Sequence, residues 1–266
     1  MSDLKNIIII TARQRSGTNA LGSILDSHSN FTYCGEVFRS IDESITRPYN
    51  YYYYLNKHCN LFDCMPHKLE NNFDHYINYL QETINTDYIV LDIKYNQWTT
   101  MGRDGGFLVA TPPPLISFVQ KRNFPIINLE RHNYLRSYIS MESLKRRKSG
   151  YSSSQIQIPI NKILHILSLY EQEHKAIQIY FQNYMNIIRI EYADLFPKIN
   201  QSANVQIIKE LAKWLKVDNY FATTPKTRKK NINPMSKIIA NYSLVQKALK
   251  NTKYSYLLKD EPIYNE

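Results

Sequence analysis

The sequence predicts a three-layer α/β fold in which helices flank a central parallel sheet. At 266 residues, the chain has the length of one α/β domain, and we expect a single domain over 1–266. An apolar, β-branched run at 7–11 is followed at once by a short polar loop and then by an apolar helical segment at 20–25. Further strand-length runs alternate with helical patterns, which is typical of a parallel sheet covered on both faces.

The remaining elements follow from their hydrophobic periodicity. We expect three more strands, at 88–94, 125–130 and 186–192. Helical patterns occupy the segments between and after the strands, at 72–83, 113–121, 133–147, 161–184, 205–215 and 236–250. The prolines at 112–114 predict a helix start, because proline is tolerated at the first helical position.

Two segments lack such periodicity. The region 39–71 contains four consecutive tyrosines at 51–54, and we interpret it as a polar, aromatic insertion rather than a core element. The segment 148–158 is rich in serine and glutamine, a composition that predicts a mobile loop.

The composition indicates an anionic partner. The formal net charge is +10 at pH 7, which suits nucleic acid, an acidic membrane face or a ligand with phosphates and sulfates, and a solvated basic surface is the alternative. Three cysteines without a regular framework argue against a secreted disulfide scaffold. No apolar stretch reaches the about 18 residues of a membrane helix, and the start lacks a secretory signal. We therefore expect a cytoplasmic protein without a transmembrane segment.

The polar loop after the first strand is the first candidate site. Arg15-Ser16-Gly17-Thr18, followed by Asn19, lies between an apolar strand and a helix. A helix N-terminus presents free backbone N–H groups, to which this loop adds two hydroxyls and a cation. The nucleoside-triphosphate pattern Gly-x4-Gly-Lys-Ser/Thr is absent, and so is Gly-x-Gly-x-x-Gly. The loop predicts a site for a doubly anionic group, with a plain strand-to-helix turn as the alternative.

A second anion site is predicted at the end of the 125–130 strand. Arg131 leaves this strand, and Ser140 follows nine residues later on the next helix. An arginine and a hydroxyl at the carboxyl end of a strand suit another phosphate group. Anion sites at two strand ends match a nucleoside that carries phosphates at both ends.

The two motifs together resemble those of the sulfotransferases that use 3′-phosphoadenosine-5′-phosphosulfate (PAPS), especially the bacterial carbohydrate branch that includes trehalose sulfotransferases. In that branch a strand ends in Arg-Ser-Gly-(Ser/Thr) and is followed by a helix and a Gly-Glu pair, which here is Gly35-Glu36. The branch's later Arg-x-Asn-x-Leu…Ser element corresponds to Arg131, Asn133, Leu135 and Ser140.

One spacing departs from the family. Many relatives have eight residues from the arginine to the serine, and in that frame His132 takes the place of Arg131. We favour Arg131, because Asn133 and Leu135 then fall in register with the carbohydrate branch. Both frames stay open at the level of sequence.

The resemblance implies a P-loop-like fold, PAPS as the sulfuryl donor, adenosine 3′,5′-bisphosphate (PAP) as the product, and no required metal. Arg15 and the loop 16–19 would bind the donor and stabilise the charge that builds on the leaving phosphate. Arg131 and Ser140 would hold the 3′-phosphate. Three cations of the C-terminal half would close over the same end, with a plain basic loop as the alternative: Arg228, Lys229 and Lys230.

The acceptor side depends on two further residues. Glu36, from the Gly-Glu pair, is the candidate general base, and a surface or helix-capping glutamate is the alternative. Lys94, at the end of a predicted strand, would lie near the sulfuryl group or the acceptor, and a solvated lysine is equally compatible with the sequence. We expect a small-molecule or glycan acceptor, with 39–71 and 148–158 bordering its site, and no nucleic-acid partner.

Two other classes of function are compatible with the sequence. A kinase-like phosphoryl transferase could use the same loop, and a non-catalytic basic protein could bind nucleic acid or another polyanion. The spacing of His58-Cys59…Cys64…His67 fits no common zinc pattern, so we predict no metal site. The sequence leaves the acceptor's identity and the oligomeric state undecided.

Overall fold

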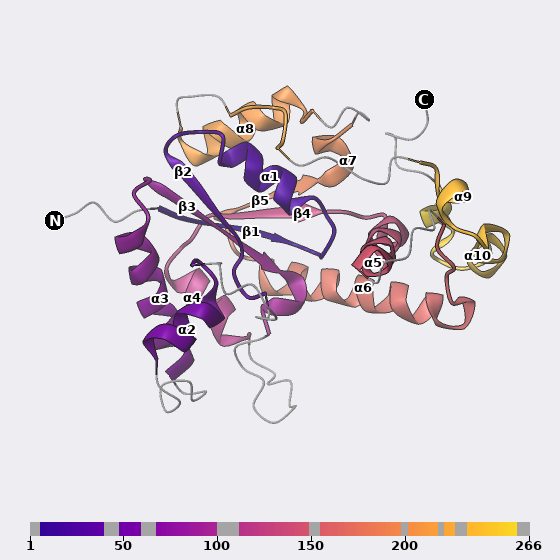
Figure 1. The fold of residues 1–266 in the computed structure, drawn as a ribbon, viewed down its shortest axis with the longest axis horizontal. Helices are drawn as coiled ribbons and strands as arrows, with labels where there is room; N and C mark the ends of the chain where they lie inside the picture. Colours follow the sequence, from indigo (N-terminus) through magenta and orange to yellow (C-terminus); the bar gives the residue numbers. More distant parts are fainter. Residues whose placement is uncertain are drawn as a thin grey trace.

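The computed structural model describes residues 6–39, 48–59, 68–99, 112–148, 155–197, 202–217, 221–226 and 233–259. Within these ranges, five strands form one sheet in the order β2-β3-β1-β4-β5, and every neighbouring pair is parallel (Figure 1). The strands are β1 (Asn6–Ala12), β2 (Phe31–Glu36), β3 (Tyr88–Lys94), β4 (Ile126–Glu130) and β5 (Ile187–Glu191). The predicted central parallel sheet is confirmed.

The strand order places the carboxyl end of β1 at a topological switch point. The chain leaves β1 towards β2 and β3 on one side, and it leaves β4 towards β5 on the other side. In open parallel sheets, ligands bind at the carboxyl edge where connections diverge in this way. The loops that follow β1 and β4 are therefore the expected walls of a binding site.

Helices cover both faces of the sheet. On one face, a buried cluster joins the sheet to α1 (Thr18–Leu25), α7 (Tyr192–Leu195) and α8 (Val205–Leu215). On the other face, a second cluster joins it to α2 (Tyr51–His58), α3 (Leu69–Thr83), α4 (Pro114–Lys121) and α6 (Ile160–Tyr180). Because β1 is covered on both sides, Ile8, Ile9 and Ile10 are all fully buried, which explains its continuous apolar run.

A third apolar cluster lies beside the sheet. It joins α5 (Tyr134–Lys148) and the N-terminal half of α6 to α9 (Met235–Ile238), α10 (Tyr242–Leu249) and the 3-10 turn η4 (Ser255–Leu258). Figure 1 shows this group beyond the carboxyl end of β4. This cluster packs α5, which follows β4, against the C-terminal helices.

The strand β2 was missed by the sequence analysis. It lies at the edge of the sheet, and most of its side chains are half-buried, so its sequence Phe-Thr-Tyr-Cys-Gly-Glu has no apolar alternation. Gly35 takes a left-handed φ of 74°, and the pairing with β3 shifts register between Tyr33 and Glu36. A glycine with positive φ at such a shift is typical of a β-bulge.

The interpretation of 39–71 as lacking a core element is wrong for its described part. The side chain of Asn50 accepts hydrogen bonds of 2.9 and 3.1 Å from the backbone N–H groups of Tyr52 and Tyr53, and so caps the N-terminus of α2. Tyr51 and Tyr54 lie on the inner side of this helix, where they are 2% and 7% exposed. Their rings pack against α3, so this helix belongs to the core. Residues 40–47 and 60–67 lie outside the described ranges.

Two C-terminal expectations also change. The predicted helix 236–250 is two helices, because Asn241 leaves the helical path and exchanges hydrogen bonds with the backbone of Ile158. The end of the 148–158 segment is not a loose loop, since Ile156 and Ile158 are buried at 2% and 1% exposure. Residues 149–154 lie outside the described ranges.

No helix within the described ranges is both long and apolar enough to cross a membrane.

Candidate anion-binding site

The loop between β1 and α1 has an unusual backbone. Arg15 and Gly17 take left-handed φ values of 69° and 86°. A Cβ on Gly17 would come within 2.6 Å of the ring of Tyr192, so this position requires glycine for both conformation and space. The first residue of α7 thus packs directly against the loop and helps to fix its shape.

Two features of the loop and of the first turn of α1 suit a bound anion. Gly17 is the N-cap of α1, and it supplies no side-chain hydrogen bond to the first turn. The Ser16 hydroxyl is buried, and within the described ranges no group hydrogen-bonds to its oxygen. A buried hydroxyl without a partner costs stability. An anion oxygen bound above the helix N-terminus would satisfy both features.

Lys94 joins the end of β3 to the same loop. Its ammonium donates to Thr18 Oγ1 and to both carboxylate oxygens of Asp92, at 2.8 and 2.6 Å. The register of the sheet explains this contact, because Lys94 pairs with Ala12, the last residue of β1. Lys94 is 5% exposed and Asp92 is fully buried, so the solvated strand-end lysine of the sequence analysis is excluded.

Tyr33 completes this network from β2. Its hydroxyl lies 3.0 Å from Asp92 Oδ2 and 3.1 Å from Asn19 Oδ1. Burial and the adjacent Asp92 carboxylate raise the pKa of Tyr33 well above its ordinary value, so it stays protonated and can donate. Asn19, on the first turn of α1, is thereby tied to β2 and β3.

Glu36 lies at the same edge of the sheet as Lys94. Its Oε1 accepts a hydrogen bond of 2.7 Å from Gln97 Nε2. In turn, Gln97 Oε1 accepts a hydrogen bond of 2.8 Å from the backbone N–H of Lys94. Gln97 belongs to the short turn η3 (Tyr95–Gln97) that ends β3. The carboxylate of Glu36 therefore accepts a hydrogen bond from the Gln97 amide, and the residue is half-buried.

The second predicted cluster contacts the first. Arg131 Nη1 donates to the carbonyl oxygen of Arg15 at 2.8 Å, and its guanidinium lies over the Tyr192 ring. Arg15 Nε donates to Ser140 Oγ at 3.1 Å. The structure thus brings Arg15, Arg131 and Ser140 together at the switch point between β1 and β4.

Asn133 fixes the turn between β4 and α5 that carries Arg131 and leads to Ser140. Its Oδ1 accepts the backbone N–H of Arg136 at 3.0 Å, and this cap starts α5 directly after the β4 turn. Its Nδ2 donates to the carbonyl of Lys259 at 3.0 Å, which fixes the turn against the C-terminal segment. The turn is compact, and Ser140 therefore faces the loop despite the nine-residue spacing.

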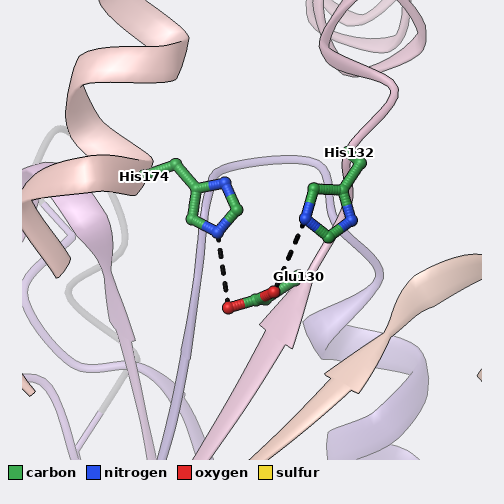
Figure 2. Close-up of side chains that lie close together, drawn as sticks. All are labelled: Glu130, His132 and His174. Carbon is green, nitrogen blue, oxygen red and sulfur yellow. Dashed lines mark ion pairs between the residues drawn. The ribbon is translucent and has the colours of Figure 1, made fainter. Parts of the chain in front are cut away.

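The side chain of His132 contacts Glu191 and Glu130 instead of the β1–α1 loop. Its Nδ1 lies 2.5 Å from Glu191 Oε2, and its Nε2 lies 3.6 Å from Glu130 Oε2 (Figure 2). The hydrogen bond to Glu191 raises the pKa of His132. Of the two residues that the spacing left open, Arg131 is the one that contacts the β1–α1 loop.

Some residues escaped the sequence analysis, and others fall outside the structure's described ranges. Asp92, Tyr33 and Gln97 were not predicted, although an aspartate within the apolar run Ile-Val-Leu-Asp-Ile-Lys is a signal, because a carboxylate there must be paired. The predicted cations Arg228, Lys229 and Lys230 lie within 227–232, outside the described ranges.

Comparisons with known proteins give a limited result. No protein-family model matches the chain, and no curated protein matches it. Among solved structures, it is similar to mouse sulfotransferase SULT7A1 complexed with PAP, at 12% sequence identity and a TM-score of 0.48, over 95% of this chain and 88% of that chain.

Proposed function

We propose that the protein is a sulfotransferase that moves a sulfuryl group from PAPS to a hydroxyl of a carbohydrate or glycoconjugate. The observation that carries this proposal is the buried Ser16 hydroxyl, which has no hydrogen-bond partner among the described residues and lies at the N-terminus of α1 between Arg15 and the Lys94–Thr18 contact. The order of the Arg-Ser-Gly-Thr, Gly-Glu and Arg-x-Asn…Ser motifs, which resembles that of PAPS-dependent enzymes, supports it.

The loop suits the 5′ side of the donor. PAPS supplies the sulfuryl group, and its transfer leaves negative charge on the PAP phosphate. The backbone N–H groups of the first turn of α1, the Ser16 hydroxyl and the Arg15 guanidinium would stabilise that charge. Since Gly17 and Tyr192 fix the loop before the ligand arrives, little reorganisation would be needed.

Arg131 and Ser140 are proposed to hold the 3′-phosphate. Both residues contact Arg15, so the two halves of the anion site adjoin each other. A bisphosphate could exchange these contacts for stronger ones, because hydrogen bonds between a guanidinium and a phosphate are charge-assisted. Arg228, Lys229 and Lys230 are proposed to close over this end of the donor.

Glu36 is proposed as the general base. It shares the edge of the sheet with Lys94, which is linked to it through Gln97. A carboxylate in this place could take the proton of an acceptor hydroxyl as the hydroxyl oxygen attacks sulfur. Lys94 is proposed to stabilise the sulfuryl oxygens by exchanging its hydrogen bond to Thr18 for one to the bound group.

The network at Lys94 distinguishes this proposal from a kinase-like activity. Asp92 is the carboxylate connected to the loop through Lys94, and both of its oxygens already accept hydrogen bonds. It is fully buried and neutralised by the Lys94 ammonium. An acid that holds the magnesium of a nucleoside triphosphate must face the bound ion, and the fully buried Asp92, whose charge Lys94 compensates, is poorly suited to that role.

Calorimetric titration of the purified protein with PAP, with ATP as the comparison, tests the donor class. We expect micromolar binding of PAP, which corresponds to about −8 kcal/mol, and weak binding of ATP. A folded sample that binds no PAP contradicts the proposal, and steep salt-dependent binding of nucleic acid in its place would favour a polyanion-binding protein.

The acceptor is tested separately. The carbohydrate acceptor rests on the resemblance to the carbohydrate branch, and 39–71 and 148–158 are proposed to border its site. Transfer of radioactive sulfate from labelled PAPS to a panel of mono- and disaccharides, phenols and lipids distinguishes the classes. Transfer to phenols alone would remove the carbohydrate assignment and leave the sulfotransferase reaction in place.

A further inference from the structure

Two histidines face one glutamate at the carboxyl end of β4. Glu130 is the last residue of the strand, His132 follows in the turn, and His174 comes from α6 (Figure 2). Their ligand-forming atoms all lie within 4.8 Å of one another. The anion-binding loop does not use this cluster, because Arg131 and His132 leave the turn in different directions.

The spacing suits a bound metal ion. His174 Nε2 lies 3.3 Å from Glu130 Oε1, and His132 Nε2 lies 3.6 Å from Glu130 Oε2. Two ligands on one zinc ion, with bonds of about 2.0–2.1 Å and a tetrahedral angle, lie roughly 3.3–3.4 Å apart. The two distances run to different oxygens of Glu130 and are both close to this separation, so a carboxylate that binds an ion with both oxygens could share it with the two histidines.

Each histidine has its other ring nitrogen occupied. His132 Nδ1 is held by Glu191 Oε2 at 2.5 Å, and His174 Nδ1 is held by the Tyr134 hydroxyl at 2.8 Å. Glu130 accepts a hydrogen bond of 2.8 Å from Asn128. Outer partners of this kind orient histidine ligands and fix the tautomer in metal sites. Both Nε2 atoms are consequently turned towards the glutamate.

The cluster has one buried side and one open side. Glu130 and His174 are 9% and 6% exposed, whereas the side chain of His132 is 54% exposed. A pocket of about 400 Å³ is lined by both histidines and by Tyr134, Glu171, Lys175, Gln178, Lys253, Tyr254 and Tyr256. An ion could enter from this pocket, and a fourth ligand such as water could face it.

We propose that Glu130, His132 and His174 bind one divalent transition-metal ion of the zinc class. Two imidazoles and one carboxylate form a donor set that zinc and its neighbours accept and that magnesium and calcium do not prefer. The amide of Gln178, whose Nε2 lies 3.2 Å from His174 Nε2, would turn aside into the pocket. The proposal revises the expectation of no metal site, and it does not rest on the sulfotransferase activity.

Titration with zinc tests the site directly. Chelator-treated full-length protein is titrated with ZnCl₂ by calorimetry, and we expect one ion per chain with micromolar or tighter affinity. His132→Ala should lower the affinity at least 100-fold while the fold is kept, because this side chain is largely exposed. Glu191→Gln should lower it about 10–100-fold, since Glu191 only orients the ligand.

Matched controls locate the ion. His165 is an exposed histidine on α6, the helix that carries His174, and His165→Ala should leave the affinity unchanged. Cys59→Ser tests the cysteine–histidine segment 58–67 as the alternative binder. Co²⁺ loading adds a visible absorption spectrum, whose d–d bands should disappear in His132→Ala and persist in both controls.

Two results would overturn the proposal. One is a folded wild-type protein that takes up no stoichiometric zinc. The other is zinc binding that survives His132→Ala unchanged, or that is lost in Cys59→Ser. Either result would leave the cluster as a buried histidine–glutamate ion pair.

Discussion

At the scale of single residues, two glycines near the anion site have backbone conformations that are unfavourable for most other residues. Gly17 and Gly35 both have positive φ, of 86° and 74°. They differ in their surroundings, because a Cβ at Gly17 would meet the Tyr192 ring at 2.6 Å, whereas a Cβ at Gly35 would meet nothing within 4 Å. A comparison of alanine variants at these two positions therefore separates the cost of backbone strain from the cost of steric overlap.

Gly17→Ala should destabilise the protein more than Gly35→Ala does. The left-handed conformation costs an alanine about 1–2 kcal/mol at either position. At Gly17, displacement of the Tyr192 ring adds about 1–3 kcal/mol. Urea unfolding of both variants measures the difference. Equal losses would mean that the Tyr192 ring moves aside without cost.

Glu36→Gln should lower turnover and leave PAP binding unchanged. Glutamine keeps the shape of the side chain and can still meet Gln97, but it cannot take a proton. General base catalysis contributes about 10²–10⁴-fold, and we expect a loss of kcat in that range. Steady-state sulfuryl transfer together with PAP titration measures both quantities. Wild-type turnover in this variant would remove Glu36 as the base.

Local motifs were predictable from the sequence, and contacts that depend on the register and packing of the sheet were not, even where one partner, such as Lys94, had been singled out. The Arg-Ser-Gly-Thr loop is contiguous, so its position between a strand and a helix was evident from the sequence. The contact of Lys94 with Thr18 spans 76 positions and follows from the pairing of β1 with β3. The same holds for Glu130 and His174, which come together only because α6 packs across the end of β4.

At the scale of elements, buried charge joins β3 to α1. Asp92 is fully buried, and its charge is compensated by Lys94, which in turn contacts Thr18. Lys94→Met should destabilise the fold by about 3–5 kcal/mol, because it leaves a buried carboxylate without a counter-charge. Denaturant unfolding measures this loss.

The double variant Lys94→Met/Asp92→Asn provides the control. It removes the uncompensated charge together with the lysine, so it should recover part of the lost stability. A double variant that is as unstable as Lys94→Met alone would show that packing, not charge, causes the loss.

A pH-dependent contact joins α6 to the C-terminal segment. Hydrogen bonds from Lys175, Lys253 and the Tyr254 hydroxyl lower the pKa of Glu171 from 4.5 to about 2. A carboxyl whose pKa is lower in the folded state stabilises the fold above its unfolded value, and this contribution disappears as the pH falls from 4.5 towards 2. Because Glu171 lies near the surface, solvent weakens the effect.

Glu171→Gln should therefore lose stability relative to wild type at pH 7 and lose less at pH 3. Urea unfolding at the two pH values, at low and at high salt, measures the difference. The salt series serves as the control, since exposed ion pairs are screened. A difference of the same size at both pH values would assign the effect to packing.

At the scale of the whole molecule, the layers decide where a ligand acts. The loops after β1 and β4 adjoin at the carboxyl edge of the sheet, where Arg131 donates a hydrogen bond to the carbonyl of Arg15. A ligand bound at this edge would contact elements from both halves of the sheet, including α1, β3 and α5. Such a ligand should stabilise the molecule globally, since it binds the folded chain and not the unfolded one.

PAP at 100 times its Kd should add about 2.7 kcal/mol to the free energy of unfolding. For a chain of this size, 1 kcal/mol shifts Tm by about 2–4 °C, so we expect a rise of roughly 5–10 °C. Arg15→Ala and Arg131→Ala should each reduce the rise at the same PAP concentration. Arg131→Ala also removes the hydrogen bond to the Arg15 carbonyl, so it should lower Tm even without PAP.

Arg122, which is paired with Asp74 on the surface, supplies the matched control, and Arg122→Ala should keep the full rise. A PAP-induced rise that both loop variants retain would place the bisphosphate away from the switch point between β1 and β4.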